Sequence, residues 1–242
     1  MKRILVMVLT FMMISSVAFA SEEYSEEIVF RDTPWGISFT EADKLFSEYQ
    51  MYPMTGEGMK FYPVEQVYSD EYDTRHTPEY HDINIIGMST GQGSHSNVAG
   101  YTTSSITLHF AYAVIDGVIT HEEKDSKMYG AQYKFEPADP KAVFDDLAEK
   151  LKGLYGDVDD AGRYELPRYY TTEWWTWNGA NNTAVTLAIR IYGPELSSDD
   201  EVWIAYYTKD GDAWLYEASD GEKERLLRQE REGAASGNTN GL

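Results

Sequence analysis

The sequence contains no cysteine among its 242 residues. This absence excludes a disulfide framework, and it excludes a lipid-anchored lipoprotein, because the lipid of such proteins is attached to a cysteine at the cleavage point. Catalysis by a cysteine nucleophile is excluded for the same reason. The fold must therefore be stabilised by core packing alone.

Basic residues are scarce: 20 Lys and Arg stand against 41 Asp and Glu, which gives a formal net charge of −21. Such a chain repels nucleic acid and anionic lipid surfaces, so we expect no nucleic-acid partner. Aromatic residues, in contrast, make up 14% of the chain, which is too many for a disordered protein. The composition favours a folded, β-rich extracytoplasmic protein.

The sequence has a long apolar run only near its beginning, where Lys2 and Arg3 precede residues 4–14. The segment ends with the small residues Ala18 and Ala20, which is typical of a secretory signal peptide over residues 1–20. The run is shorter than the about 20 residues of a membrane span. We expect cleavage after Ala20 and a secreted or extracytoplasmic mature chain that does not span a membrane. An uncleaved N-terminal anchor is the alternative.

Composition divides the remaining chain into three parts. Residues 21–29 (SEEYSEEIV) predict an acidic, flexible lead-in, and residues 217–242 predict a charged, flexible C-terminal tail. Residues 30–216 are predicted to form a single domain. Within it, residues 50–97 are rich in Tyr, Pro, Gly and Asp, and only short strands are expected there.

Two amphipathic helices are predicted. Pro34-Trp35-Gly36 leads to Ser38 and Glu41, which have the spacing of a capping box, so a helix is expected from Phe39 to Tyr49 with Trp35 as a core side chain beside its start. The second helix follows Asp139 and Pro140 and ends at Gly156. Its apolar stripe consists of Phe144, Leu147, Leu151, Leu154 and Tyr155.

Strands are predicted where apolar and polar residues alternate or where short apolar runs occur. The predicted strands are 61–68, 83–88, 104–114, 128–136, 171–178, 183–193, 201–208 and a short one at 213–216. Turn signals at Asp116-Gly117, Asn181-Asn182 and Asp210-Gly211 join several of them as hairpins. The order predicts an α+β fold: an antiparallel sheet of about six strands, with the two amphipathic helices packed on one face.

Several of these features together resemble a known group of proteins. They are the Pro-Trp-Gly motif before a capped helix, Tyr133 and Phe135 in one strand, the helix ending at Leu154-Tyr155-Gly156, the Trp-bearing strand, and Val202, Ile204 and Tyr206 in the last strand. The pattern is similar to small secreted bacterial proteins of unknown function. A fainter likeness is to β-lactamase-inhibitor-type modules, whose helices back a sheet whose open face binds protein. Those modules usually carry disulfides, and this chain has none. The resemblance implies a fold and a location, and no activity.

Candidate metal ligands lie in the 50–97 segment: His76, His81 with Asp82, and His95. Imidazole and carboxylate suit zinc, but the spacing matches no familiar site. We therefore expect solvated side chains and predict neither a metal nor a cofactor.

Paired acids occur at 145–146, 159–160 and 199–200. Glycoside hydrolysis needs two carboxyl groups about 5–9 Å apart across a cleft, and adjacent acids on a helix exterior or in turns do not provide this. We expect these acids to be solvated, and the sequence predicts no catalytic residues. An extracellular hydrolase that uses carboxylates, with or without a metal, remains the alternative function.

The leading prediction is a secreted, non-catalytic binding module whose partner is an extracellular protein or a glycan. Alternation places His109, Arg190, Trp203 and Tyr207 on the sheet face away from the helices, together with either Trp174 or the pair Trp175 and Trp177. If that face is open, these side chains form one surface of the kind that recognition uses. The alternative is a second layer, built from residues 50–97, that covers this face and makes the rings core.

Overall fold

An antiparallel sheet of eight strands forms the centre of the molecule in the computed structural model, which describes residues 26–48, 51–54, 84–89 and 96–236. In spatial order the strands are β1 (Met51–Met54), β2 (Asn84–Ser89), β5 (Ser105–Ala111), β8 (Lys127–Phe135), β12 (Glu201–Thr208), β11 (Thr183–Tyr192), β10 (Tyr170–Asn178) and β9 (Asp160–Leu166). Every neighbouring pair is antiparallel. The predicted α+β class and antiparallel sheet are confirmed, with eight strands instead of about six.

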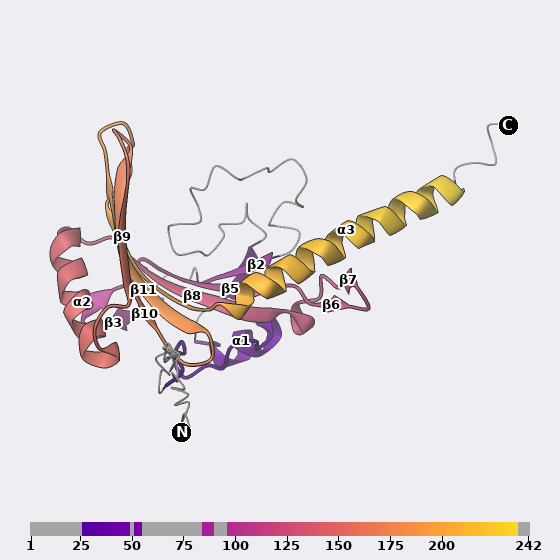
Figure 1. Cartoon of the computed structure of the whole chain (residues 1–242), viewed down its shortest axis with the longest axis horizontal. Coiled ribbons are helices and arrows are strands. Elements are labelled where there is room, and N and C mark those ends of the chain that lie inside the picture. Colours follow the sequence, from indigo (N-terminus) through magenta and orange to yellow (C-terminus); the bar gives the residue numbers. More distant parts are fainter. Residues whose placement is uncertain (1–25, 49–50, 55–83, 90–95, 237–242) are drawn as a thin grey trace, which may run out of the picture.

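The other elements surround this sheet (Figure 1). The helices are α1 (Phe39–Leu45), α2 (Pro140–Tyr155), α3 (Asp210–Ser236) and the short 3-10 helix η3 (Glu123–Asp125). Two small hairpins join β3 (Asn97–Val98) to β4 (Tyr101–Thr102), and β6 (Val114–Ile115) to β7 (Val118–Ile119). Figure 1 shows α3 starting at the sheet and extending away from the rest of the molecule.

Helices α1 and α2 pack into one core with one face of the sheet, as the sequence predicts. Each helix gives a large buried ring to this core, Phe39 from α1 and Phe144 from α2. Alternate residues of the strands complete it, among them Ile106, Leu108, Phe110, Val185, Leu187, Ile189, Val202 and Ile204. Because side chains alternate along a strand, the residues between these positions point to the opposite face.

The predicted starts of both helices and the predicted end of α2 are confirmed. The Ser38 backbone N–H donates to Glu41 Oε2 at 2.9 Å, and the Glu41 N–H donates to Ser38 Oγ at 3.2 Å. These bonds from Ser38 also lower the pKa of Glu41. Asp139 accepts from the Ala142 N–H at 3.0 Å, and Gly156 ends α2 with φ +88°. Helix α1 stops at Leu45, short of the predicted Tyr49.

One part of the predicted α2 stripe is wrong. Leu147 and Leu151 are buried, but Leu154, one turn further, is 72% exposed. All three leucines lie on the same side of the helix, so Leu154 is exposed because α2 extends beyond the part of the core that covers this side. The burial of this side ends one turn before the helix does.

The predicted short strand at 213–216 is also wrong, because these residues belong to α3. Leu215 and Ala218 pack with Tyr129 of β8 and Ile119 of β7. Gly211 permits this contact, since a Cβ there would lie 2.6 Å from the Tyr129 Cβ. The helix continues through 217–236, so most of the segment predicted as a flexible tail is helical.

Other predictions fall on different parts of the chain. The strand expected at 83–88 is β2, and the turns at Asp116-Gly117 and Asn181-Asn182 have the positive φ angles of hairpin turns. The expected signal peptide (1–20), the strand at 61–68 and the residues His76, His81, Asp82 and His95 lie outside the described residues. Strands β1 and β9 were not predicted.

The Pro-Trp-Gly motif attaches the segment before α1 to the sheet. Gly36 has φ +82°, and its N–H donates to the Met128 carbonyl of β8 at 2.9 Å. The Trp35 indole N–H donates to the Ile28 carbonyl at 2.9 Å, and its partly buried ring packs against the main core.

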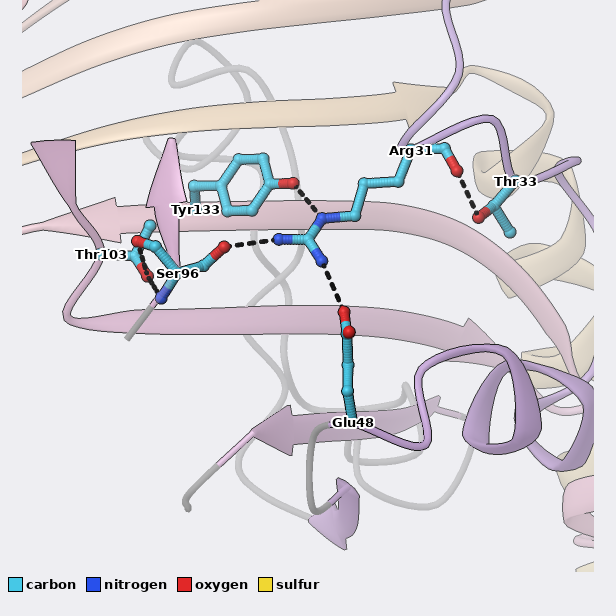
Figure 2. A network of polar contacts seen from close by, with 6 residues as sticks. All are labelled: Arg31, Thr33, Glu48, Ser96, Thr103 and Tyr133. Carbon is cyan, nitrogen blue, oxygen red and sulfur yellow. Dashed lines mark hydrogen bonds and ion pairs between the residues drawn. The ribbon is translucent and has the colours of Figure 1, made fainter. Parts of the chain in front are cut away.

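Arg31 makes a second attachment (Figure 2). Its Nε donates to the Tyr133 hydroxyl of β8 at 2.6 Å, and its Nη2 donates to Ser96 Oγ at 2.7 Å. Glu48, which follows α1, accepts from Nη1 at 3.4 Å. One guanidinium therefore connects the chain before α1, the chain after α1 and the sheet.

We expect Trp35→Ala to lower the free energy of unfolding by about 2–3 kcal/mol, at or below the usual cost of removing a fully buried ring, because this ring is partly exposed. Urea denaturation measures the change. Pro34→Ala is the control, since Pro34 is exposed beside it. Equal midpoints for the two variants would contradict a structural role for Trp35.

Candidate functional site

The four predicted binding residues share the sheet face away from α1 and α2, but they form two separate groups. His109 of β5 and Tyr207 of β12 are both aligned with Gly130 of β8, which lies between them. Arg190 and Trp203 lie toward the other end of the strands. Trp203 and Tyr207 are four residues apart on β12, which corresponds to about 13 Å.

His109 and Tyr207 are buried, with exposed fractions of 2% and 7%, so the prediction that they belong to an exposed surface is wrong. Helix α3 packs against β5 and β8 in this part of the sheet and contributes to a second core around Tyr129. The His109 and Tyr129 rings are 5.9 Å apart. Burial lowers the pKa of His109 to about 3, so its imidazole is neutral near pH 7 and behaves as a core residue.

Arg190 and Trp203 do meet, in a cluster of charged and aromatic side chains on this face. We define the Arg190 cluster as Lys134, Tyr170, Arg190, Tyr192, Glu201 and Trp203. The guanidinium carbon of Arg190 lies 4.8 Å from the Tyr170 ring centroid, 6.0 Å from that of Tyr192 and 5.1 Å from that of Trp203. Three rings thus surround one cation, which is a cation–π arrangement.

A buried carboxylate neutralises the positive charges of the cluster. Glu201, 8% exposed, accepts from Lys134 Nζ at 2.6 Å, from the Tyr192 hydroxyl at 2.9 Å and from Arg190 Nη1 at 3.5 Å. Burial alone would lower the pKa of Lys134, but its bonds to Glu201 and Glu136 raise it, so the ammonium keeps its charge. Burial raises the pKa of Tyr192, which keeps the phenol protonated as a donor.

Trp174 lies beside this cluster. The sequence left open whether Trp174 or the pair Trp175 and Trp177 lies on this face, and the structure decides for Trp174. Trp174 is on the Arg190 face and is buried there with Ala188 and Trp203, whereas Trp175 and Trp177 belong to the main core. Gly162 of β9 makes room for the indole, because a Cβ at this position would lie 2.0 Å from Trp174 Cζ2. Arg190 and Trp203 are partly exposed, with 21% of the Arg190 side chain accessible.

Alternation alone could have found part of this cluster. Tyr192 is two residues after Arg190, and Glu201 is two residues before Trp203, so both share their face. Tyr170 was harder to predict from the sequence, because its place beside Tyr192 depends on the register that the Asn181-Asn182 turn sets between β10 and β11.

At least one acid of each predicted pair has a structural partner. Asp146 on α2 accepts from Lys150 and from the Tyr101 hydroxyl, and Asp145 pairs with Lys141. Asp159 accepts from the Asn178 N–H, and Asp200 accepts from the Tyr192 N–H, both at 2.7 Å. Within the described ranges no group of three or more His, Asp or Glu side chains could hold a metal ion.

The comparisons with known proteins add no relative. No family model, no curated protein and no solved structure matches the chain. The resemblance to small secreted bacterial proteins and to inhibitor-type modules therefore stays a prediction. Among the described helices, none is long and apolar enough to cross a membrane.

Proposed function

We propose that this chain is a secreted, non-catalytic binding module and that the Arg190 cluster contacts its partner. The observation that carries the proposal is the partly exposed pair Arg190 and Trp203, flanked by tyrosines, on the sheet face that α1 and α2 leave uncovered. Trp, Tyr and Arg are the residues that dominate the binding energy of protein interfaces. Their intramolecular stacking holds the side chains in place before a partner arrives, which lowers the entropy cost of binding.

A protein is a better partner than a glycan for this cluster. Sugars bind aromatic side chains by laying C–H groups on an open ring face. The guanidinium of Arg190 already lies over the rings of Tyr170, Tyr192 and Trp203. The edges of these rings and the outer surface of the guanidinium suit contact with backbone and side-chain groups of a protein.

The hydrolase alternative finds little support in the cluster. A glycosidase needs one carboxyl group as an acid with a raised pKa and a second carboxyl facing it across a cleft. Both Glu201 oxygens accept from internal donors, and Lys134 pairs with Glu201 and Glu136 alike. The two carboxylates therefore share one lysine in an ion-pair network and do not face each other as a catalytic pair.

Secretion is part of the proposal and is supported by the Lys2-Arg3 start, the apolar run and the Ala18-Phe19-Ala20 ending. The lack of cysteine is compatible with an oxidising compartment, since no thiol has to be kept reduced.

A binding experiment tests the proposal. The chain, purified from the medium or envelope of its producing cells, is used to capture a partner, whose affinity is then measured by titration. We expect Trp203→Ala to weaken binding by at least about 30-fold, the equivalent of a 2 kcal/mol hot spot. The control is Tyr216→Ala, which removes a 68% exposed ring from α3.

Thermal denaturation of both variants, followed by titration well below their midpoints, separates lost binding from lost folding. Equal affinities of the two variants would show that the Arg190 cluster is not part of the interface. A partner that proves to be a polysaccharide would refute the choice of a protein.

A further inference from the structure

Strand β9 is an edge strand of the sheet as far as the described residues form it. Among the described strands it pairs only with β10, and the pairing runs from Asp160 to Leu166 without a register shift. The opposite edge strand, β1, is shorter and contains Pro53, which lacks a backbone N–H to donate. An edge strand offers unpaired backbone groups to another strand, so β9 is the edge that can accept one.

The charges on β9 determine which strand fits. Arg163 and Glu165 lie on one side of the strand, 64% and 59% exposed, with Tyr164 between them on the Arg190 face. Charged side chains on an edge normally prevent pairing. Here, however, the two charges are opposite and two positions apart, so an antiparallel copy of β9 can place each against its complement.

We propose that β9 pairs with β9 of a second copy of this chain, antiparallel and centred on Tyr164. Of the possible two-fold registers, this one sets Arg163 of each copy opposite Glu165 of the other. It also sets Gly162 opposite Leu166. Centring the pair on Arg163 or on Glu165 would instead bring like charges together, which destabilises cross-strand pairs.

The same register makes the two sheets continuous. Tyr164 of each copy meets its counterpart on the Arg190 face, and within one chain the Tyr164 ring already lies 6.2 Å from the Tyr170 ring of the cluster. The dimer would therefore carry two Arg190 clusters on one surface. This pairing does not depend on what the cluster binds, so it stands or falls separately from the proposed function.

A strand pair of this length forms a small interface, so the dimer is expected to be weak, with a dissociation constant of about 1–100 μM. Sedimentation of the full mature chain over a concentration series that brackets this range measures it directly. The salt concentration is set at about 0.15 M, where the long-range repulsion between two acidic chains is largely screened.

Charge reversal tests the register. Arg163→Glu alone and Glu165→Arg alone each put like charges opposite one another, and each should raise the dissociation constant by at least about 10-fold. Mixing the two single variants in equal amounts places two acidic side chains of one chain against two basic side chains of the other. The mixture should dimerise at least as well as the wild-type chain, and so should the double variant.

Because the two single variants are examined together, misfolding of either cannot imitate the expected result. A wild-type chain that stays monomeric at the highest concentration overturns the proposal. So does a dimer insensitive to both reversals, or a loss of dimer that mixing does not restore. The chain could also be monomeric and bind a captured partner that Arg163→Glu releases. This result would assign the β9 edge to another protein and would also overturn self-pairing.

Discussion

Phe144→Ala is expected to lower the free energy of unfolding by about 4 kcal/mol, the middle of the range for deleting a fully buried phenylalanine. Phe144 is wholly inaccessible to solvent and stacks edge-on against Trp175 of β10 at 5.6 Å. It is the ring by which α2 joins the sheet, so its removal leaves a cavity that rigid neighbours cannot fill. Urea denaturation at 25 °C gives the difference.

Leu154→Ala is the matched control, because it truncates another apolar side chain of the same helix that is 72% exposed. We expect its effect to stay within about 0.5 kcal/mol. If Leu154→Ala proved as costly as Phe144→Ala, α2 would have to pack along its whole length, contrary to the structure.

Glu201→Ala should have the second-largest effect, a loss of about 3 kcal/mol, which is the lower end of the range for removing one partner of a buried ion pair, because Lys134 and Arg190 are partly exposed. Without this carboxylate, Lys134 and Arg190 remain beside one another on a partly buried surface, and the Tyr192 hydroxyl loses its acceptor. Chemical denaturation again supplies the measurement.

Glu136→Ala is the control, because it removes the same charge from a more exposed partner of Lys134. Glu136 pairs with the same Lys134 at 3.0 Å, but its side chain is 42% exposed, so we expect a change of about 0.5 kcal/mol or less. Equal losses from the two glutamate variants would show that the burial of Glu201 has no energetic consequence, and that the cluster is not held by its carboxylate.

Local signals in the sequence account for much of the fold. The Ser38–Glu41 capping box, the Asp139 cap and the Asn181-Asn182 turn each fix a conformation through neighbours a few residues away, and all three are found as predicted. Strand alternation likewise separated the two faces of β5, β11 and β12, because the period of two is a property of the backbone.

The predictions are wrong or incomplete where contacts with residues distant in the sequence determine the conformation. At 213–216 four apolar or aromatic residues are too few to distinguish a strand from a helix. Contacts with residues distant in the sequence, among them Tyr129 and Ile119, favour the helix α3. Strand β9 has few apolar residues, so its sequence does not predict a strand. Its register depends on pairing with β10 and on the fit of Trp174 against Gly162.

The candidate site was predicted in part for the same reason. Alternation correctly placed Arg190, Trp203, His109 and Tyr207 on one face, but it cannot tell which portion of a face another element covers. Helix α3 packs near His109 and Tyr207 and leaves Arg190 and Trp203 partly exposed. Glu201, which neutralises the cluster, follows two other acids in the sequence, and no pattern there predicts that its side chain is buried.

Oxidative footprinting of the captured complex shows directly whether a partner covers the Arg190 cluster. Hydroxyl radicals modify exposed aromatic side chains, and the modification of Trp203 can be compared with that of Tyr216 with and without the partner. We expect binding to lower the modification of Trp203 at least about threefold, since a hot-spot ring is desolvated on binding, and to leave the modification of Tyr216 unchanged. Unchanged modification of Trp203 in a saturated complex would contradict the claim that the Arg190 cluster is the binding surface.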